Sequence, residues 1–390
     1  MNLKTLSIIS VLLIIFNVDV SPAQESSEST QDTLWTYYED EPVVITATRL
    51  TNTAYRTPYS VDYIEQSRIQ LAEPTISLSE ALQQVPGFVI QNRQNQALGE
   101  RITSRGLGSR AQFGVRGVKI IVDDIPLTLA DGQAQTSNID LGSTEQIEVI
   151  RGPSSSLYGN AAGGVIQLET QVLDKQQPLR LEAKGMTGSF GLRKWQAKAM
   201  GNGENYNYTL NLSQTQSDGF RDHSAYKYQQ LNTVAKYRVT NRISLTGMLN
   251  YYNAPYLMNP SSLSKQDALN DPTKVRGFIV SQGAAEQPSQ LQGGVTAKYQ
   301  VNEAEFMRVT VYGIGRSLIN PIPGRIIDLN RNAGGIRASY HSSFDISQIP
   351  LQMITGIDYE IQDDHRQEFE NNGLPEGEAD SIVREDIFNR

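Results

Sequence analysis

Two polar stretches of the chain, residues 107–116 and 128–136, contain arginine and amide side chains that suit an anionic small molecule. Guanidinium groups and side-chain amides donate charge-assisted hydrogen bonds to negatively charged oxygen atoms. Such a set predicts recognition of an anionic molecule such as a metal chelate. The alternative interpretation is that these are solvated loop charges that pack only against neighbouring loops. The candidate binding residues are Arg110, Gln112, Phe113, Arg116, Asp131, Gln133 and Gln135.

No pattern in the sequence indicates catalysis or a resident metal. No acid–base or nucleophilic pair recurs at a recognisable spacing, and the three histidines, His223, His341 and His365, are scattered. The chain has no cysteine, which excludes disulfides and thiol chemistry. Residues 106–111 imitate a dinucleotide-binding fingerprint, but glycines interrupt any helix that could follow them. We therefore expect that the protein is not an enzyme and has no resident cofactor or metal.

The charge and composition of the chain favour a β-rich protein over a nucleic-acid binder. Its 390 residues include 34 basic and 42 acidic side chains, a formal net charge of −8. A nucleic-acid-binding domain would show a basic excess or a basic stripe. Only 38% of the residues are hydrophobic, a value expected of strands with one polar face. The length leaves room for two or three domains.

Residues 1–23 have the layout of a secretory signal peptide. A short basic region precedes an apolar run at residues 6–16, and small residues follow at the position of cleavage. A membrane anchor is the alternative, but this run is short for a spanning helix and Asp19 follows it closely. No later segment reaches about 18 consecutive apolar residues, so any membrane role must use strands or a surface.

Residues 24–49 read as a flexible tether that ends in a β-prone segment. The polar, low-complexity part favours disorder over packing. The segment Glu41-Pro-Val-Val-Ile-Thr-Ala-Thr-Arg49 follows it. An exposed segment of this kind can join a partner sheet through backbone hydrogen bonds. Spacing alone favours the alternative, an ordinary first strand of the next domain.

Residues 50–172 predict a compact domain with both helices and strands. Apolar residues recur at helical spacing from Leu78 to Val85, and Pro86-Gly87 is a standard helix end. Short apolar runs separated by turn residues predict the strands of this domain. The predicted strands include 118–122, 147–150 and 165–168.

After about residue 178, polar and apolar side chains alternate with period two. Strands of about ten residues, tilted in a sheet, cross the apolar layer of a bilayer. Short turns such as 202–203 alternate with longer loops such as 253–287 and 319–332, and residues 363–368 are expected in a further external loop. This asymmetry is typical of outer-membrane barrels, although a soluble β-sandwich shows the same alternation. The predicted strands are 179–190, 192–202, 205–217, 226–239, 242–252, 289–301, 305–318, 333–345 and 350–363.

Several motifs, in a fixed order, resemble those of the TonB-dependent outer-membrane transporters. Residues 147–170, with Ile147-Glu-Val-Ile-Arg-Gly-Pro153 and Tyr158-Gly-Asn-Ala-Ala-Gly-Gly164, resemble the end of the family's plug domain. Leu78–Gly87, Ile102–Gly108 and Val122–Pro126 resemble its earlier motifs, and the loops 107–116 and 128–136 look like the apices of the plug. Residues 41–49 resemble the TonB box, which reverses the preference drawn from spacing. The matching TonB-box residues are Glu41, Pro42, Val43, Val44, Ile45, Thr46 and Ala47.

The resemblance implies an α+β plug domain at 50–172, inside or followed by an antiparallel transmembrane β-barrel that begins at 173. Family barrels have about 22 strands, and residues 173–390 suffice for about 8 to 10 of them. We therefore expect the N-terminal part of a longer barrel. In the family, plug arginines pair with barrel glutamates. Arg105 and Arg151 match these plug positions, and Glu360 is a candidate partner because alternation points it inward.

The resemblance also implies a function, a location and partners. The expected location is the outer membrane of a Gram-negative bacterium, with lipid around the barrel and with the plug and TonB box facing the periplasm. The implied function is active import, energised by TonB and its inner-membrane complex, of a ferric siderophore or ferric citrate-type chelate. Any metal then arrives only as part of that chelate, and no nucleic-acid partner is expected. Uptake of cobalamin or haem is an alternative, as is a non-transporting binding or signalling receptor.

Overall fold

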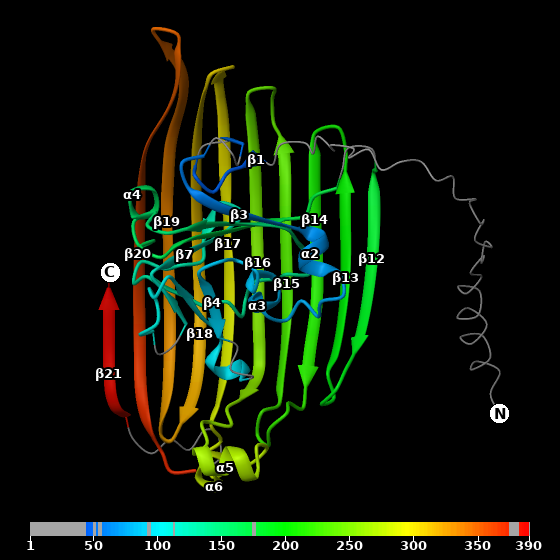
Figure 1. The fold of residues 1–390 in the computed structure, drawn as a ribbon, viewed down its shortest axis with the longest axis vertical. Coiled ribbons are helices and arrows are strands. Elements are labelled where there is room, and N and C mark those ends of the chain that lie inside the picture. Colours follow the sequence, from blue (N-terminus) through cyan, green and yellow to red (C-terminus); the bar gives the residue numbers. More distant parts are fainter. Residues whose placement is uncertain are drawn as a thin grey trace, which may run out of the picture. The chain divides into compact units, whose positions relative to one another are not determined.

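The computed structural model describes residues 44–49, 52–53, 57–91, 95–111, 114–173, 177–373 and 382–389. The predicted signal peptide and most of the tether lie outside the described residues. The described residues belong to one compact unit. This unit consists of a large antiparallel sheet and a smaller α+β domain, the plug, which packs against one face of that sheet (Figure 1).

Ten strands form the large sheet, and each strand pairs with its neighbours in the sequence. The alternation of polar and apolar residues predicted nine of them, which the structure confirms, but it did not predict the tenth. The strands are β12 Leu179–Thr187, β13 Arg193–Asn202, β14 Tyr206–Ser217, β15 Tyr226–Arg238, β16 Ile243–Met258, β17 Ala285–Asn302, β18 Glu305–Ile322, β19 Gly324–Ile346, β20 Ile349–Asn371 and β21 Ile382–Asn389.

The connections between these strands differ at the two ends of the sheet. At one end, called here the short-turn end, the connections are only residues 203–205, 239–242, 303–304 and 347–348. At the other end, the long-loop end, residues 259–284 form a loop that carries α5 (Lys265–Asn270) and α6 (Gly277–Ser281). Figure 1 shows these two helices below the sheet. The predicted asymmetry of the connections is therefore present.

Two predicted loops at the long-loop end are wrong. Residues 319–332 form a tight hairpin, because β18 continues to Ile322, which pairs with Arg325 of β19. Residues 363–368 belong to β20, which runs from Ile349 to Asn371. Both errors have one cause: these strands extend well past the length that a bilayer requires.

The large sheet is apolar on its outer face and polar on the face toward the plug. On β14, Leu210 and Leu212 are 37% and 42% exposed, whereas their neighbours Thr209 and Asn211 are fully buried. A water-soluble sandwich would bury the leucines and expose the polar residues. The reversed arrangement fits a sheet that has lipid on one side and a polar interior on the other. It excludes the soluble β-sandwich.

The helices of the described residues are short. None of them is both long enough and apolar enough to cross a membrane.

The plug is built on a five-stranded sheet with the order β3-β10-β11-β7-β8. Buried aliphatic side chains, including Leu82, Ile120 and Ile147, form its core. The predicted helix is confirmed as α3, and Ser77 and Glu80 cap its start reciprocally. The main elements are β3 Ser60–Glu65, α2 Gln66–Gln70, α3 Leu78–Leu82, β7 Val118–Val122, β8 Ile125–Pro126, β10 Thr144–Arg151 and β11 Gly164–Thr170. The paired short strands are β1 Val44–Ile45 with β2 Asn52–Thr53, β4 Phe88–Gln91 with β5 Arg101–Ser104, and β6 Val115–Arg116 with β9 Gln133–Ala134.

One glycine of the plug shows why the motif at its end requires this residue. Gly164 has a φ of +127°, and a Cβ atom there would lie 2.2 Å from the carbonyl oxygen of Ile150. Only glycine tolerates both this backbone conformation and this approach. The close packing of β11 on β10 therefore depends on it.

The plug contacts strands β13–β15 mainly through neutral polar side chains. Gln196 donates to the carbonyl oxygen of Gly142 at 2.9 Å, and Asn232 donates to the hydroxyl of Ser143 at 2.9 Å. These groups are buried, so each needs its partner. Hydrogen bonds between buried polar groups of the plug and of strands β13–β15 therefore hold the plug against this part of the sheet.

Candidate functional site

The predicted TonB box lies against the plug at the short-turn end. Its described part begins with β1, in which Val44 and Ile45 pair with Thr53 and Asn52. Ile45 and Ala47 are fully buried, whereas Val44 is 49% exposed. Glu41, Pro42 and Val43 of the predicted box lie outside the described residues. The remainder of the box is thus a short segment held at both its side chains and its backbone.

A single carboxylate of the plug holds the backbone of this segment. Glu148 Oε2 accepts hydrogen bonds from the backbone N–H of Thr46 at 2.8 Å and of Ala47 at 2.6 Å. Tyr158 donates its hydroxyl to the carbonyl oxygen of Ala47 at 2.7 Å. Burial raises the pKa of the Glu148 carboxyl, while the Ala47 and Thr46 N–H groups oppose that rise by stabilising the charge. Glu148 is thus a buried acceptor whose principal donors belong to the predicted TonB box.

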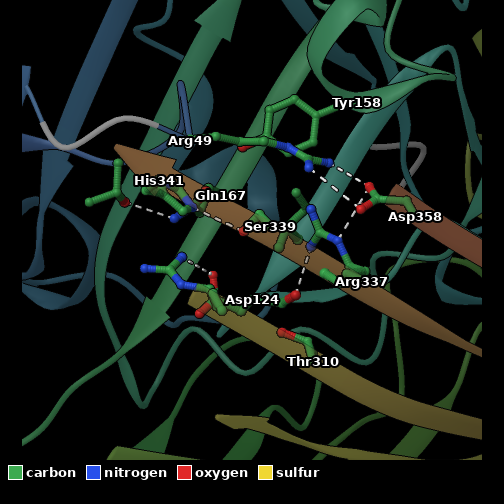
Figure 2. A pocket seen from close by; sticks show the side chains of 13 residues that line it. Arg49, Asp124, Tyr158, Gln167, Thr310, Arg337, Ser339, His341 and Asp358 are labelled. Atoms are coloured by element: carbon green, nitrogen blue, oxygen red, sulfur yellow. Dashed lines mark hydrogen bonds and ion pairs between the residues drawn. The ribbon is translucent and has the colours of Figure 1, made fainter. Parts of the chain in front are cut away.

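Arg49, at the end of the same segment, links it to the large sheet. Its guanidinium forms an ion pair with Asp358 of β20 at 2.5 Å and lies over the ring of Tyr158, 4.5 Å from the centroid. Arg337 of β19 approaches the same carboxylate at 3.5 Å and donates to the carbonyl oxygen of Asp124 at 2.8 Å. Figure 2 shows these groups converging around a small cavity of ≈ 40 Å³. We call Arg49, Asp358 and Arg337 the clasp.

The plug forms further ion pairs with strands β18–β20. Lys119 pairs with Glu360 at 2.9 Å, and Arg308 pairs with Asp124 at 3.2 Å. Glu360 therefore contacts the plug through Lys119 and not through either predicted arginine. The sequence contained a signal for this contact, because Lys119 is the one charged residue of the otherwise apolar strand β7.

The two predicted plug arginines have other surroundings. Arg151 pairs with Asp62, a plug residue, at 2.5 Å. Arg105 is exposed, with a φ of 47°, and forms no ion pair within the described part of the chain. Neither arginine contacts Glu360 in this structure.

A larger cavity, of ≈ 650 Å³, lies at the long-loop end between the plug, strands β17–β20 and the loop 259–284. Its volume is within the range of ligand-binding pockets. Of the predicted binding residues, Gln133 and Gln135 line it. Its lining also includes charged side chains of the sheet, among them Glu286, Arg316 and Arg331.

The other predicted binding residues lie at or beyond the margin of this cavity. Asp131 pairs at 3.4 Å with Arg331, which also binds Asp364 through two hydrogen bonds of 2.6 Å. Arg116 donates to the carbonyl oxygen of Asp131 at 3.2 Å, and Arg110 is exposed. Gln112 and Phe113 lie outside the described residues. In the described ranges, no group of three or more acidic or histidine side chains is placed to hold a metal ion.

Residues 53–165 match the family model of the TonB-dependent receptor plug domain. The chain therefore contains a TonB-dependent receptor plug domain. Curated relatives include a hemin receptor of Yersinia enterocolitica, 28% identical over 255 residues, and the vitamin B12 transporter BtuB of Vibrio vulnificus, 28% identical over 139 residues. The first match covers 60% of this chain and 36% of the relative, and the second covers 35% and 22%.

The fold of the chain is that of solved TonB-dependent receptors. The unliganded ferric citrate transporter FecA superposes with a TM-score of 0.71 at 21% sequence identity, covering 84% of this chain and 51% of that chain. The chain thus spans about half the length of that structure and little more than a third of the hemin receptor. The plug and the ten-stranded sheet correspond to a plug domain and part of a receptor β-barrel.

Proposed function

We propose that the complete protein imports a scarce ligand across the outer membrane, energised through the TonB box by TonB and its inner-membrane complex. The observation that carries this proposal is the arrangement of the two sites on the plug. The docked TonB box lies at the short-turn end, and a ligand-sized cavity lies at the long-loop end. In this proposal the short-turn end faces the periplasm.

The contacts of the TonB box suit a segment that is released by force. Its backbone is held by two amide hydrogen bonds to Glu148, one hydrogen bond from Tyr158 and a two-residue strand pairing. Its side chains are held by a hydrogen bond from Gln167 to Thr46 and one ion pair at Arg49. The hydrogen bonds to the Glu148 carboxylate contribute about 1.5–3 kcal/mol each, and each of the other contacts contributes on the order of 1 kcal/mol. A pull on the segment therefore acts first on these few bonds, whereas the plug core of buried aliphatic side chains resists longer.

The ligand that we propose first is a ferric siderophore or ferric citrate-type chelate, because arginine and amide side chains border the cavity. Uptake of haem or cobalamin is the second candidate, supported by the names of the hemin receptor and vitamin B12 transporter relatives. A receptor that binds ligand without transporting it is the remaining alternative, and the uptake measurement below distinguishes it.

The experiment uses the full-length gene in iron-starved cells, with labelled ligand. Val44→Pro removes a backbone N–H from the TonB box and prevents pairing with a partner strand. Val44→Thr is the matched control, because it keeps both the β-branched shape and the N–H. We expect Val44→Pro to abolish uptake while leaving binding at the cell surface intact, and Val44→Thr to retain both. Unchanged uptake by the proline variant would overturn the TonB-box assignment.

A further inference from the structure

The cavity at the long-loop end has an apolar wall on a face of the sheet that is otherwise polar. Elsewhere, inward apolar side chains such as Val234 and Met248 are buried against the plug residue Ile125. At the long-loop end of β18 and β19 the inward apolar side chains face the cavity, and Leu318 pairs directly across the ladder with Leu329. The apolar wall consists of Leu98, Leu127 and Leu129 of the plug with Leu318, Ile322, Ile327 and Leu329 of the sheet.

An apolar wall of this kind is unfavourable unless a ligand covers it. Leu318, Ile327 and Leu329 are only partly buried, so water contacts them when the cavity holds no ligand. Apolar surface gains about 25 cal/mol for each Å² removed from water. The wall therefore favours an occupant with an extended apolar body over a small hydrophilic one.

The charges around the cavity limit the occupant further. Arg331 and Arg366 already pair with Asp364 and Glu368, each at 2.6 Å. Arg316 differs: it donates to Gln290 at 3.4 Å, and no carboxylate in the described part of the chain lies within ion-pair distance of it. Arginine is well suited to binding a carboxylate through two parallel hydrogen bonds.

A second charged group argues against a highly charged ligand. Glu286 also lines the cavity and accepts a hydrogen bond from Asn320 at 3.4 Å. Its carboxylate interacts electrostatically with Arg316. It would therefore repel a polyanion bound there, whereas a ligand with few negative charges can still place one carboxylate on Arg316. The cavity therefore combines one available cation, one acidic group and an apolar wall.

We propose that this cavity binds an amphiphilic ligand, with a rigid apolar body against Leu318 and Leu329 and a carboxylate on Arg316. This inference rests on the proposed import function and narrows its ligand. Among the ligands proposed above, it favours a lipophilic ferric siderophore or an apolar macrocycle that carries one or two carboxylates over a compact polyanion such as ferric citrate.

The test measures equilibrium binding to the purified full-length receptor in lipid nanodiscs. The probe is protoporphyrin IX, an apolar macrocycle with two carboxylates, and its dimethyl ester is the matched uncharged probe. We expect Arg316→Gln to weaken binding of the acid about tenfold and to leave binding of the ester unchanged, because a charge-assisted hydrogen bond is lost. Leu329→Asn should weaken both probes. Lys298→Gln, which changes an inward cation near the short-turn end, is the control and should change neither.

Several results would contradict the inference. It is wrong if protoporphyrin IX does not bind, if ferric citrate binds more tightly, or if Arg316→Gln affects acid and ester equally. Heat-modifiable migration on a gel confirms that each variant is folded. If only the import proposal is wrong, the probes bind as expected here, but cellular uptake is the same for Val44→Pro and the parent.

Discussion

Removing the Glu148 carboxylate should release the TonB box without unfolding the plug. Glu148 accepts from the N–H groups of Thr46 and Ala47. Hydrogen bonds to a charged group contribute about 1.5–3 kcal/mol each, against about 1 kcal/mol for neutral ones. Glu148→Gln keeps one acceptor oxygen but loses the charge. After allowing for the relief of a buried charge, we expect a loss of about 1–2 kcal/mol, which shifts the docked-to-released equilibrium about tenfold.

The assay is electron paramagnetic resonance of a spin label on the TonB box of the full-length receptor. These 390 residues contain no cysteine, so Val44→Cys adds one labelling site among them, and the Val44 side chain is half-exposed. Any cysteine in the remainder of the receptor is first replaced by serine. We expect an immobilised spectrum in the parent, a mixed spectrum in Glu148→Gln and a mostly mobile one in Glu148→Ala. The alanine variant removes both acceptor oxygens, so the two N–H groups must turn to water.

The control is a carboxylate beside the same segment. Glu169 accepts a hydrogen bond from the hydroxyl of Thr46 at 3.2 Å and one from Gln167 of the plug at 3.5 Å, and neither is a backbone N–H of the segment. Glu169→Gln should therefore leave the spectrum close to that of the parent. If Glu148→Ala remains as immobile as the parent, Glu148 does not hold the segment and the reasoning is refuted.

Three further predictions concern the clasp, the plug core and the effect of pH. In a double-mutant cycle, Arg49→Gln and Asp358→Asn should show a coupling of about 1–2 kcal/mol in the same spin-label equilibrium; additive effects would contradict the ion pair. Gly164→Ala should destabilise the plug by about 3 kcal/mol, measured by calorimetry, because its Cβ would clash with the Ile150 carbonyl at a backbone angle that only glycine adopts. Burial raises the pKa of Asp123 to about 6, so its contribution to plug stability is greatest below its ordinary pKa near 4 and is lost as pH rises through 6. The melting temperature of Asp123→Asn minus that of the parent should therefore be more positive at pH 8 than at pH 5. A difference that does not change with pH would contradict this.

Much of the fold could be predicted because its signals are local. Ser77 and Glu80 lie at capping-box spacing, and Pro86-Gly87 ends the helix. The alternation from residue 179 onward follows directly from a sheet with lipid on one face and a polar interior on the other. Strand ends were predicted less well, because β19 and β20 continue beyond the bilayer and nothing local marks that limit.

The site residues were harder to predict because their contacts are distant in sequence. Glu148 stands between apolar neighbours in β10, which indicates a special role but not the partner 101 residues away. Glu360 was expected to contact an arginine, and the structure gives it Lys119, a residue on a different plug strand. The apolar wall is invisible in the sequence, because Leu318 and Leu329 look like ordinary strand residues until the register shows which face they occupy.

The most direct test of the central claim is the energy dependence of uptake by the full-length receptor. Labelled ligand is measured in otherwise identical cells with and without TonB, and separately after the proton gradient is collapsed. We predict that surface binding is equal in all three conditions, whereas accumulation inside the cell occurs only with TonB and an intact gradient. Equal accumulation without TonB would contradict the account, because the docked segment at residues 44–49 would then have no part in transport.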